Sequence, residues 1–325
     1  MIIIRKTLFW VIITFLVFSC GQDKPGFKFQ EQGREVPQFS ADSANYFIER
    51  QVNFGPRVPN TQAHKSAKNF IKEKLQKYAG QSNVFVQNFE NVVYGDTLQL
   101  YNIIAAFGTQ YSDRIVLAAH WDSRPMAEKD PIDPDSPILG ADDGGSGVGV
   151  LLELARIFRD NPPVLGVDLI FFDGEDYGKP SDLEFYFLGS RHWGNNPPVP
   201  GYNPRFGILL DMVGGKNAVF PKEGYSMQYA PSLVNEIWKI AAEKGHSDLF
   251  LDQRGAPISD DHVIVQRLTG IPMINIIHHR VGGNGEVIFP EYWHTHRDNM
   301  DIISTHTLQA VGDILLELIY NRIPV

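Results

Sequence analysis

The chain has 325 residues, of which 43% are hydrophobic and 21% charged, so it can bury a large core. Its 29 basic and 38 acidic residues give a formal net charge of −9, and no lysine- and arginine-rich run breaks that balance. This excess of negative charge disfavours nucleic acid as a partner. The length would allow two domains, but no internal linker or repeat is visible, so we expect one domain over 41–325.

The N-terminus has the features of an export signal. A basic pair precedes an apolar run over 8–18, which is shorter than the about 20 apolar residues of a membrane-spanning helix. The run ends at the only cysteine, Cys20, as in a bacterial lipobox. We expect a lipoprotein signal peptide over 1–19, with Cys20 lipidated on the periplasmic side of a bacterial cell envelope. The alternative is a coincidental cysteine in a plain signal peptide. Polar residues and glycine then predict a flexible tether over 20–40.

Hydrophobic periodicity predicts helices and strands in alternation after this tether. The helices are expected over 42–55, 61–80, 142–158, 230–245, 259–270 and 304–320. The strands are expected over 83–89, 98–108, 114–122, 168–176, 206–215 and 271–279. The first helix is expected to have Asp42 or Ser43 as its N-cap, and the second to end at Gly80.

These elements predict an α/β fold of one three-layer domain. The strands are almost continuously apolar and most are separated by helices, which is typical of a mixed, mostly parallel sheet covered by helices on both faces. The early strands have no helix between them, so we expect an antiparallel edge. No apolar helix face stands out as unpartnered, so we expect a monomer.

Polar residues gather at the carboxyl ends of the strands, where ligands bind in open α/β sheets. The strand ends, a helix start and a late loop carry the following residues: His120, Asp142, Asp143, Glu175, Asp176, Asp211, His278, His279, His294 and His296. A carboxylate inside an apolar strand, such as Asp211, needs a partner, because an unpaired buried charge is costly. One bound cation would supply that partner for several carboxylates at once.

Some of these residues have a simpler interpretation. Either Asp142 or Asp143 alone is typical of a helix N-cap, and we expect His278 and His279 to lie on the surface. Three other histidines have no acidic cluster nearby in the sequence and are expected to be structural: His64, His246 and His306. Carboxylates combined with imidazole suit zinc, which takes three protein ligands in catalytic sites. Neither C-x-x-C nor H-E-x-x-H occurs, so the predicted site depends on scattered ligands.

Seven short motifs carry a resemblance to a known family. "HWDS", "GADDGGSG", "FFDGED", "LGSRH", "LLDMVG", "SDDH" and "FPEYWHT" follow one another over residues 41–325. In this order they resemble the zinc-dependent aminopeptidase superfamily, and most closely its animal-type (type II) glutaminyl-peptide cyclotransferases. The resemblance implies a zinc-exopeptidase-like (phosphorylase/hydrolase-like) fold and one zinc ion per chain. It also implies a substrate: the N-terminal glutamine of a peptide or protein, converted to pyroglutamate with release of ammonia.

The resemblance assigns roles to individual residues. The zinc ligands of the family match Asp143, Asp176 and His294, and its proton shuttle matches Glu175. A hydrogen-bonded acidic pair in those enzymes matches two further residues, Asp211 and Asp260. The substrate pocket is expected to include these residues: Ile277, Phe289 and Trp293.

The match to the animal enzymes has gaps. Their second pocket tryptophan is absent after the acidic pair, so the mouth of the pocket must differ. Asp176 replaces the usual glutamate ligand and is one methylene shorter. Their disulfide is impossible in a chain with one cysteine.

A dinuclear zinc aminopeptidase is the alternative function. Its two metals take five ligands, which here match His120, Asp143, Asp176, Asp211 and His294. The motif of residues 260–262 and the "FPEYWHT" and "GSRH" contexts favour the cyclase over the aminopeptidase. A catalytically inactive binding protein is disfavoured, because every expected catalytic position is occupied.

Overall fold

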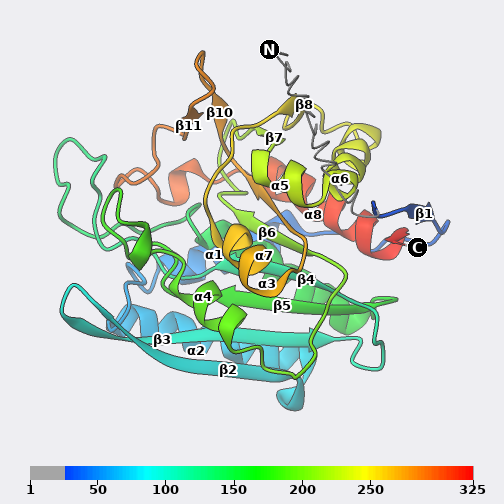
Figure 1. Cartoon of the computed structure of the whole chain (residues 1–325), viewed down its shortest axis with the longest axis horizontal. Helices are drawn as coiled ribbons and strands as arrows, with labels where there is room; N and C mark the ends of the chain where they lie inside the picture. The colour runs from blue at the N-terminus through cyan, green and yellow to red at the C-terminus, as the bar shows by residue number, and fades with distance from the viewer. Residues whose placement is uncertain (1–25, 325) are drawn as a thin grey trace, which may run out of the picture.

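The computed structural model describes residues 26–324, so the expected signal peptide and Cys20 lie outside the described range. Its centre is a six-stranded sheet with the order β2-β3-β5-β4-β6-β9 (Figure 1). The strands are β2 (Val84–Val93), β3 (Asp96–Phe107), β4 (Arg114–His120), β5 (Gly166–Phe172), β6 (Gly207–Asp211) and β9 (Met273–Ile277). Strands β5, β4, β6 and β9 are parallel, whereas β3 runs antiparallel to both β2 and β5. The predicted mixed sheet with an antiparallel edge is therefore confirmed, and the four parallel strands end at one edge.

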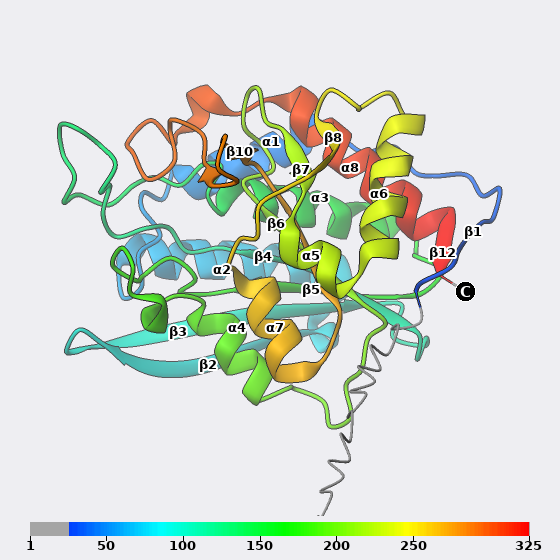
Figure 2. The ribbon, with the colours of Figure 1, turned by 45° about the horizontal axis from the view of Figure 1, so that its top comes forward.

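Helices cover both faces of this sheet, as the sequence predicted. They are α1 (Ala41–Val52), α2 (Gln62–Ala79), α3 (Gly145–Asp160), α4 (Leu188–Asn195), α5 (Gly224–Tyr229), α6 (Pro231–Glu243), α7 (Asp261–Thr269) and α8 (Thr305–Tyr320). Helices α1, α2, α3 and α8 form one layer, with α6 packed on α8, and α4 and α7 cover the other face (Figure 2). The three-layer α/β domain is confirmed.

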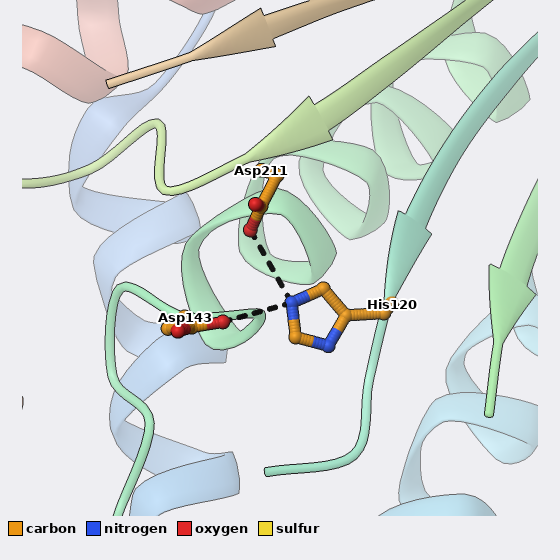
Figure 3. A group of neighbouring side chains, drawn as sticks. All are labelled: His120, Asp143 and Asp211. Carbon is orange, nitrogen blue, oxygen red and sulfur yellow. Dashed lines mark hydrogen bonds and ion pairs between the residues drawn. The ribbon is translucent and has the colours of Figure 1, made fainter. Parts of the chain in front are cut away.

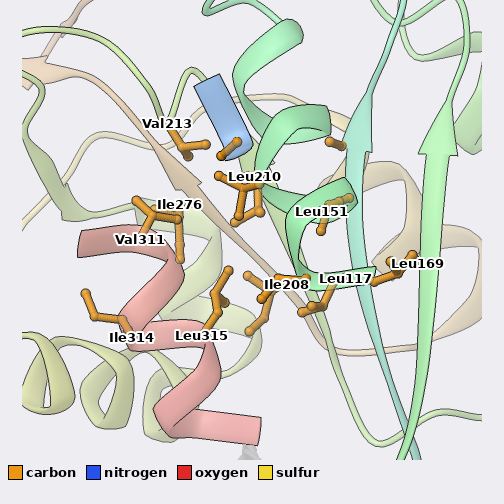
Figure 4. Packing of buried hydrophobic residues seen from close by; sticks show 14 of the residues in the cluster. Leu117, Leu151, Leu169, Ile208, Leu210, Val213, Ile276, Val311, Ile314 and Leu315 are labelled. Carbon is orange, nitrogen blue, oxygen red and sulfur yellow. The ribbon is translucent and has the colours of Figure 1, made fainter. Parts of the chain in front are cut away.

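The core lies on both faces of the central strands. Side chains alternate between the faces of a strand, so a strand that is buried on both faces must be apolar throughout. All seven residues of β5 are buried. Leu117, Leu169 and Ile208 point toward α3 and α8 (Figure 4), whereas Ile170 and Leu209 pack in a second cluster beneath α4 and α7.

The two ends of the described chain pair with each other. Strand β1 (Phe29–Glu31) is antiparallel to β12 (Arg322–Pro324). The ring of Phe27 lies 5.3 Å from that of Phe206, and Phe39 is buried. The structure therefore differs from the expected flexible tether over 26–39, because the aromatic residues of that stretch have an apolar surface to cover.

Helix boundaries follow the capping residues. Helix α1 begins at Ala41, and its N-cap is Ser40, whose side chain accepts the N–H of Ser43. The expected N-caps, Asp42 and Ser43, were therefore wrong. Helix α2 ends before Gly80, as predicted, and Gly80 takes a positive φ of 89°. Among residues 26–324, no helix combines the length and apolar character needed to cross a membrane.

The remaining elements are short and surround the carboxyl edge or the helical layers. They are β7 (Phe220–Lys222), β8 (Phe250–Arg254), β10 (Arg280–Val281), β11 (Val287–Ile288) and the 3₁₀ turns at Gln81–Asn83, Leu183–Phe185 and Met300–Ile302. Strands β7 and β8 pair in parallel, and β10 and β11 form an antiparallel hairpin. The β10–β11 hairpin leads into the segment that carries Trp293 and His294.

Candidate active site

A cavity of about 370 Å³ lies at the edge where the parallel strands end. The loop that follows β5 contributes Glu175 and Asp176 to its wall, the last residue of β6 contributes Asp211, and Asp143 comes from the turn before α3. The segment after β11 closes another side with His294. The structure thus brings residues from four separate motifs of the sequence to one place.

Asp143, Asp176 and His294 form a compact group of possible metal ligands. One donor atom from each lies within 4.8 Å of the others. The Nε2 atom of His294 is 3.6 Å from Asp176 Oδ2 and 3.8 Å from Asp143 Oδ2, and all three residues are buried. Asp176 Oδ2 is buried and has no hydrogen-bond partner among residues 26–324. A metal ion would satisfy this oxygen, and two carboxylates with one imidazole are ligands that zinc accepts at catalytic sites.

The turn before α3 holds Asp143 rigidly. The carboxylate of Asp298 accepts the N–H groups of Asp142 and Asp143 at 2.8 and 3.1 Å. Gly144 packs directly against His120, where an added Cβ would lie 2.4 Å from the His120 carbonyl oxygen. A glycine is therefore required at Gly144, the N-cap of α3, by the close approach of His120.

A turn after β5 places Glu175 and Asp176 in the cavity. Gly174 takes a positive φ of 66°, which ends the regular strand. The carboxylate of Asp122 accepts the N–H groups of Glu175 and Asp176 at 3.0 and 3.2 Å. Asp173, before this turn, points away from the cavity and lies 2.9 Å from the Nε2 atom of buried His64. The expected structural roles of Asp173 and His64 agree with this contact.

A second group of possible ligands lies beside the first (Figure 3). The Nε2 atom of His120 is 3.0 Å from Asp143 Oδ1 and 3.3 Å from Asp211 Oδ1. Asp143 is common to both groups, with Oδ1 facing His120 and Oδ2 facing His294. Burial opposes a charge on His120, but the carboxylates of Asp122, Asp143 and Asp211 together raise its pKa well above the usual value.

Several acids of the cavity hold their protons more tightly than usual. Burial raises the pKa of Glu175 well above its ordinary value, and the negative charges of Asp176, Asp260 and Asp261 add to the rise. Burial also raises the pKa of Asp211, with a further contribution from Asp260. Shifts of this kind at the base of a pocket are typical of acid–base catalysis.

Asp260 and Asp261 are fixed at the start of α7. The carboxylate of Asp260 accepts from Asp261 N at 2.5 Å and from Asn275 Nδ2 at 2.6 Å. Asp261 accepts from Ser190 Oγ at 2.5 Å, and burial raises its pKa to about 8. Asp260 lines the cavity, whereas Asp261 lies behind it against α4.

Aromatic and apolar side chains form the rest of the cavity wall. The ring centres of Phe289 and Trp293 are 4.3 Å apart, and Trp293 stacks on His294 at 3.6 Å. Ile277, at the end of β9, also lines the cavity. Among residues 26–324, Trp293 is the only tryptophan that lines the cavity, and Tyr186, in the segment after the acidic pair, lines it as well.

Sequence reasoning missed or misplaced several residues of this region. His278 and His279, expected on the surface, are buried: His278 Nδ1 lies 3.1 Å from the hydroxyl of Tyr292. Arg124 and Glu128, in the loop after β4, were not considered, although they contact Asp176 and His294 directly. Their only signal in the sequence is the spacing of opposite charges at i and i+4.

Comparison with known proteins gives one family for most of the chain. The model of peptidase family M28 matches residues 102–319. A crystal structure of a Bacteroides thetaiotaomicron glutaminyl cyclase bound to N-acetylhistamine is 47% identical, covers 88% of this chain and 99% of that one, and superposes with a TM-score of 0.83. A structure described as a leucine aminopeptidase precursor from the same species is also 47% identical, covers 88% and 98%, and has a TM-score of 0.83.

A curated relative extends the comparison to animals. The glutaminyl-peptide cyclotransferase of Bos taurus is 26% identical over 294 residues, which cover 80% of this chain and 76% of that protein. These matches confirm the resemblance and the zinc-exopeptidase-like fold that the seven motifs implied. One of these structures is described as a glutaminyl cyclase and the other as a leucine aminopeptidase precursor, which are the two functions between which the motifs did not decide.

Proposed function

Because this chain belongs to peptidase family M28, we propose that it is a zinc-dependent glutaminyl-peptide cyclotransferase acting on N-terminal glutamine. The observation that carries the proposal is its likeness to a bacterial glutaminyl cyclase across nearly the whole length of that protein. The cavity supports the proposal, because an apolar wall and a row of carboxylates suit a short amide side chain beside an amine.

The reaction requires positioning and proton transfer. The side chain of the substrate glutamine would pack against Trp293, Phe289 and Ile277, which exclude water from the reacting amide. A zinc ion held by Asp143, Asp176 and His294 would supply a Lewis acid for the side-chain carbonyl. Because nucleophile and electrophile belong to the same residue, positioning provides much of the catalysis.

Glu175 is proposed to move the proton. It accepts a proton from the substrate α-amine as the bond from the α-nitrogen to the side-chain amide carbon forms. It then donates that proton to the amide nitrogen, which leaves as ammonia when its bond to the same carbon breaks. Asp260, which accepts a hydrogen bond from Asn275, is proposed to bind the leaving nitrogen, with Asp211 as its acidic neighbour.

A dinuclear aminopeptidase is the second candidate, because His120, Asp143 and Asp211 also lie close enough together to hold a metal ion. The two functions differ in product and in metal count. We propose one zinc ion per chain for the cyclase, whereas the aminopeptidase needs two.

The deciding experiment gives purified residues 21–325 the peptides Gln-Ala-Ala and Leu-Ala-Ala with defined amounts of zinc, and follows products by mass spectrometry. Loss of ammonia from the first peptide, with the second intact and one zinc per chain by elemental analysis, is the expected result. Release of free leucine that rises with a second equivalent of zinc would replace the cyclase by the aminopeptidase.

We propose further that the protein is a monomer, anchored by a lipid on Cys20 on the periplasmic side of a bacterial cell envelope. The basic pair, the apolar run and the position of Cys20 support the anchor. Labelling of cells with a fatty-acid analogue should mark the wild-type chain and not Cys20→Ala. Light scattering of the purified domain should give the mass of one chain.

A further inference from the structure

The loop after β4 carries an ion pair between buried Arg124 and partly exposed Glu128. The guanidinium of Arg124 donates from Nε and Nη2 to the two carboxylate oxygens of Glu128, at 2.6 and 2.9 Å. Its remaining nitrogen, Nη1, donates to Asp176 Oδ1 at 2.6 Å and to the Asp176 carbonyl at 3.2 Å. The side chain of Arg124 is completely buried, and the carboxylates of Glu128 and Asp176 balance its charge.

Glu128 extends this contact to the imidazole of His294. Its Oε1 atom accepts from His294 Nδ1 at 2.5 Å. The next residue, Lys129, donates its N–H to the His294 carbonyl at 3.1 Å. A proton held on Nδ1 leaves the lone pair of Nε2 free, and Nε2 is the atom that faces Asp143 and Asp176.

Asp176 and His294 each have one polar atom bound to this ion pair and one that faces the cavity. Asp176 Oδ1 and His294 Nδ1, the outer atoms, are bound by Arg124 and Glu128. Asp176 Oδ2 and His294 Nε2, the inner atoms, face each other at 3.6 Å across the candidate metal site. One ion pair therefore fixes the direction of two of the three candidate ligands.

We propose that Arg124 and Glu128 form a positioning pair that sets the zinc affinity of the site. The inference rests on the proposed function for the identity of the metal site, but not on the reaction carried out there. Outer hydrogen bonds orient metal ligands, and their loss typically lowers metal affinity about 10–100-fold.

The pair also explains how a short aspartate serves where a glutamate is usual. Asp176 has one methylene fewer with which to reach a metal, so its carboxylate needs a fixed orientation. Arg124 supplies it by binding one oxygen of the carboxylate and the backbone carbonyl of the same residue. Its positive charge also limits the repulsion between Asp176 and Asp143.

The test measures zinc affinity directly, by competition with a fluorescent chelator, in the wild type, Glu128→Gln, Glu128→Ala and Arg124→Lys. The matched control is Glu153→Gln, which breaks another glutamate–arginine pair, between buried Glu153 and partly exposed Arg156 at 2.7 Å on α3. We expect zinc Kd to rise roughly 10–100-fold in Glu128→Ala and Arg124→Lys, and less in Glu128→Gln, whose amide still accepts from His294. The control should keep the wild-type Kd.

Two further measurements separate positioning from folding. Circular dichroism of the metal-free variants reports the fold, and the visible spectrum of the Co²⁺-loaded variants reports the ligand geometry. Folded variants with weaker zinc binding and a shifted cobalt spectrum support the proposal. Folded variants with unchanged zinc Kd and unchanged cobalt spectrum overturn it. Failure of all three variants to fold while the control folds also overturns it, because the pair would then be required for the structure of the loop and not for metal affinity.

These readouts do not depend on the reaction. If the wild type lacked cyclase activity while Glu128→Ala weakened zinc binding, the proposed function would fail and the positioning pair would stand. If the wild type were an active cyclase and the variants kept the wild-type zinc affinity, the proposed function would stand and the positioning pair would fail.

Discussion

Glu175 follows the turn after β5 and lines the cavity beside His120, a member of the second candidate metal group. Its Oε2 atom lies 4.0 Å from His120 Nδ1, and its N–H is held by Asp122. We expect Glu175→Gln to lower kcat/KM by about 10²–10⁴-fold, because the amide cannot accept and return a proton. Zinc Kd should stay near the wild-type value, since Glu175 is outside the proposed ligand set. Substantial residual cyclisation by this variant would remove Glu175 from the mechanism.

Tyr186 is an aromatic residue of the cavity wall, in the segment after the acidic pair that has no tryptophan. Its ring lies 5.5 Å from the guanidinium carbon of Arg124 and lines the cavity. An aromatic contact is worth about 0.5–1.5 kcal/mol beyond its buried area, so Tyr186→Ala should raise KM for Gln-Ala-Ala roughly 2–12-fold with little change in kcat. Tyr186→Phe keeps the ring and is the control. An unchanged KM in Tyr186→Ala would place the substrate elsewhere.

At the scale of elements, Glu223 joins two helices and one wall of the cavity. Its buried carboxylate caps α5 by accepting Ser226 N at 2.6 Å, accepts Ile258 N at 2.8 Å, and lies 3.2 Å from His262 Nε2 in α7. Burial would raise the pKa of Glu223, but His262 and these hydrogen bonds lower it to about 2. Since the unfolded value is 4.5, the difference of 2.5 units corresponds to about 3 kcal/mol of folding stability.

Because the folded pKa is lowered, this stability is present above pH 4.5 and is lost as the pH falls toward 2. Glu223→Gln should therefore be less stable than the wild type by about 3 kcal/mol at pH 7. The difference in free energy of unfolding between the variant and the wild type should decrease as the pH falls from about 5 to about 2. Urea unfolding at several pH values measures it, with exposed Glu291→Gln as the control. A difference in free energy of unfolding that does not change with pH would mean that the charge of Glu223 does not contribute to folding stability.

The elements that sequence patterns predicted are those with long apolar runs. The parallel strands and α3 have such runs, so their order and their common edge followed from the pattern. Strands β7, β8, β10 and β11 have two to five residues, too few for a period to be recognised. His278 and His279 were misplaced because a layer built from distant residues, including Tyr292, covers the end of β9.

The candidate site was predictable only in part, for a similar reason. Among the candidate ligands, Asp176 follows β5 and Asp211 ends β6, so a parallel sheet brings these two together. Asp143 and His294 lie away from the strand ends, and only the family resemblance singled them out. The partners of the loop after β4 are far away in the sequence: Asp176 lies 52 residues from Arg124, and His294 lies 166 residues from Glu128. No local pattern reports contacts of that separation.

At the scale of the whole molecule, the core does not depend on the metal. The sheet and both helical layers are packed by apolar side chains, and the candidate ligands occupy one edge. We expect the chelator-treated protein to keep its circular dichroism spectrum but unfold at a lower temperature. Zinc at a hundred times its Kd should restore about 2.7 kcal/mol, a shift of several degrees in Tm. Unfolding on chelation, or a Tm that does not respond to zinc, would contradict this expectation.

The pairing of β1 with β12 has a consequence for how the enzyme would face a membrane. Phe27 packs on Phe206, just before the amino end of β6, whereas Asp211 and the cavity lie at the opposite, carboxyl end. With a lipid on Cys20, only residues 21–25 would separate the bilayer from Gly26, at most roughly 18 Å of extended chain. That is no longer than the radius of gyration of about 19 Å expected for a domain of this size. The domain would then lie close to the bilayer with the cavity on the side that faces away from it. Peptide N-termini in the aqueous phase would reach the cavity, whereas N-termini held at the lipid surface would not.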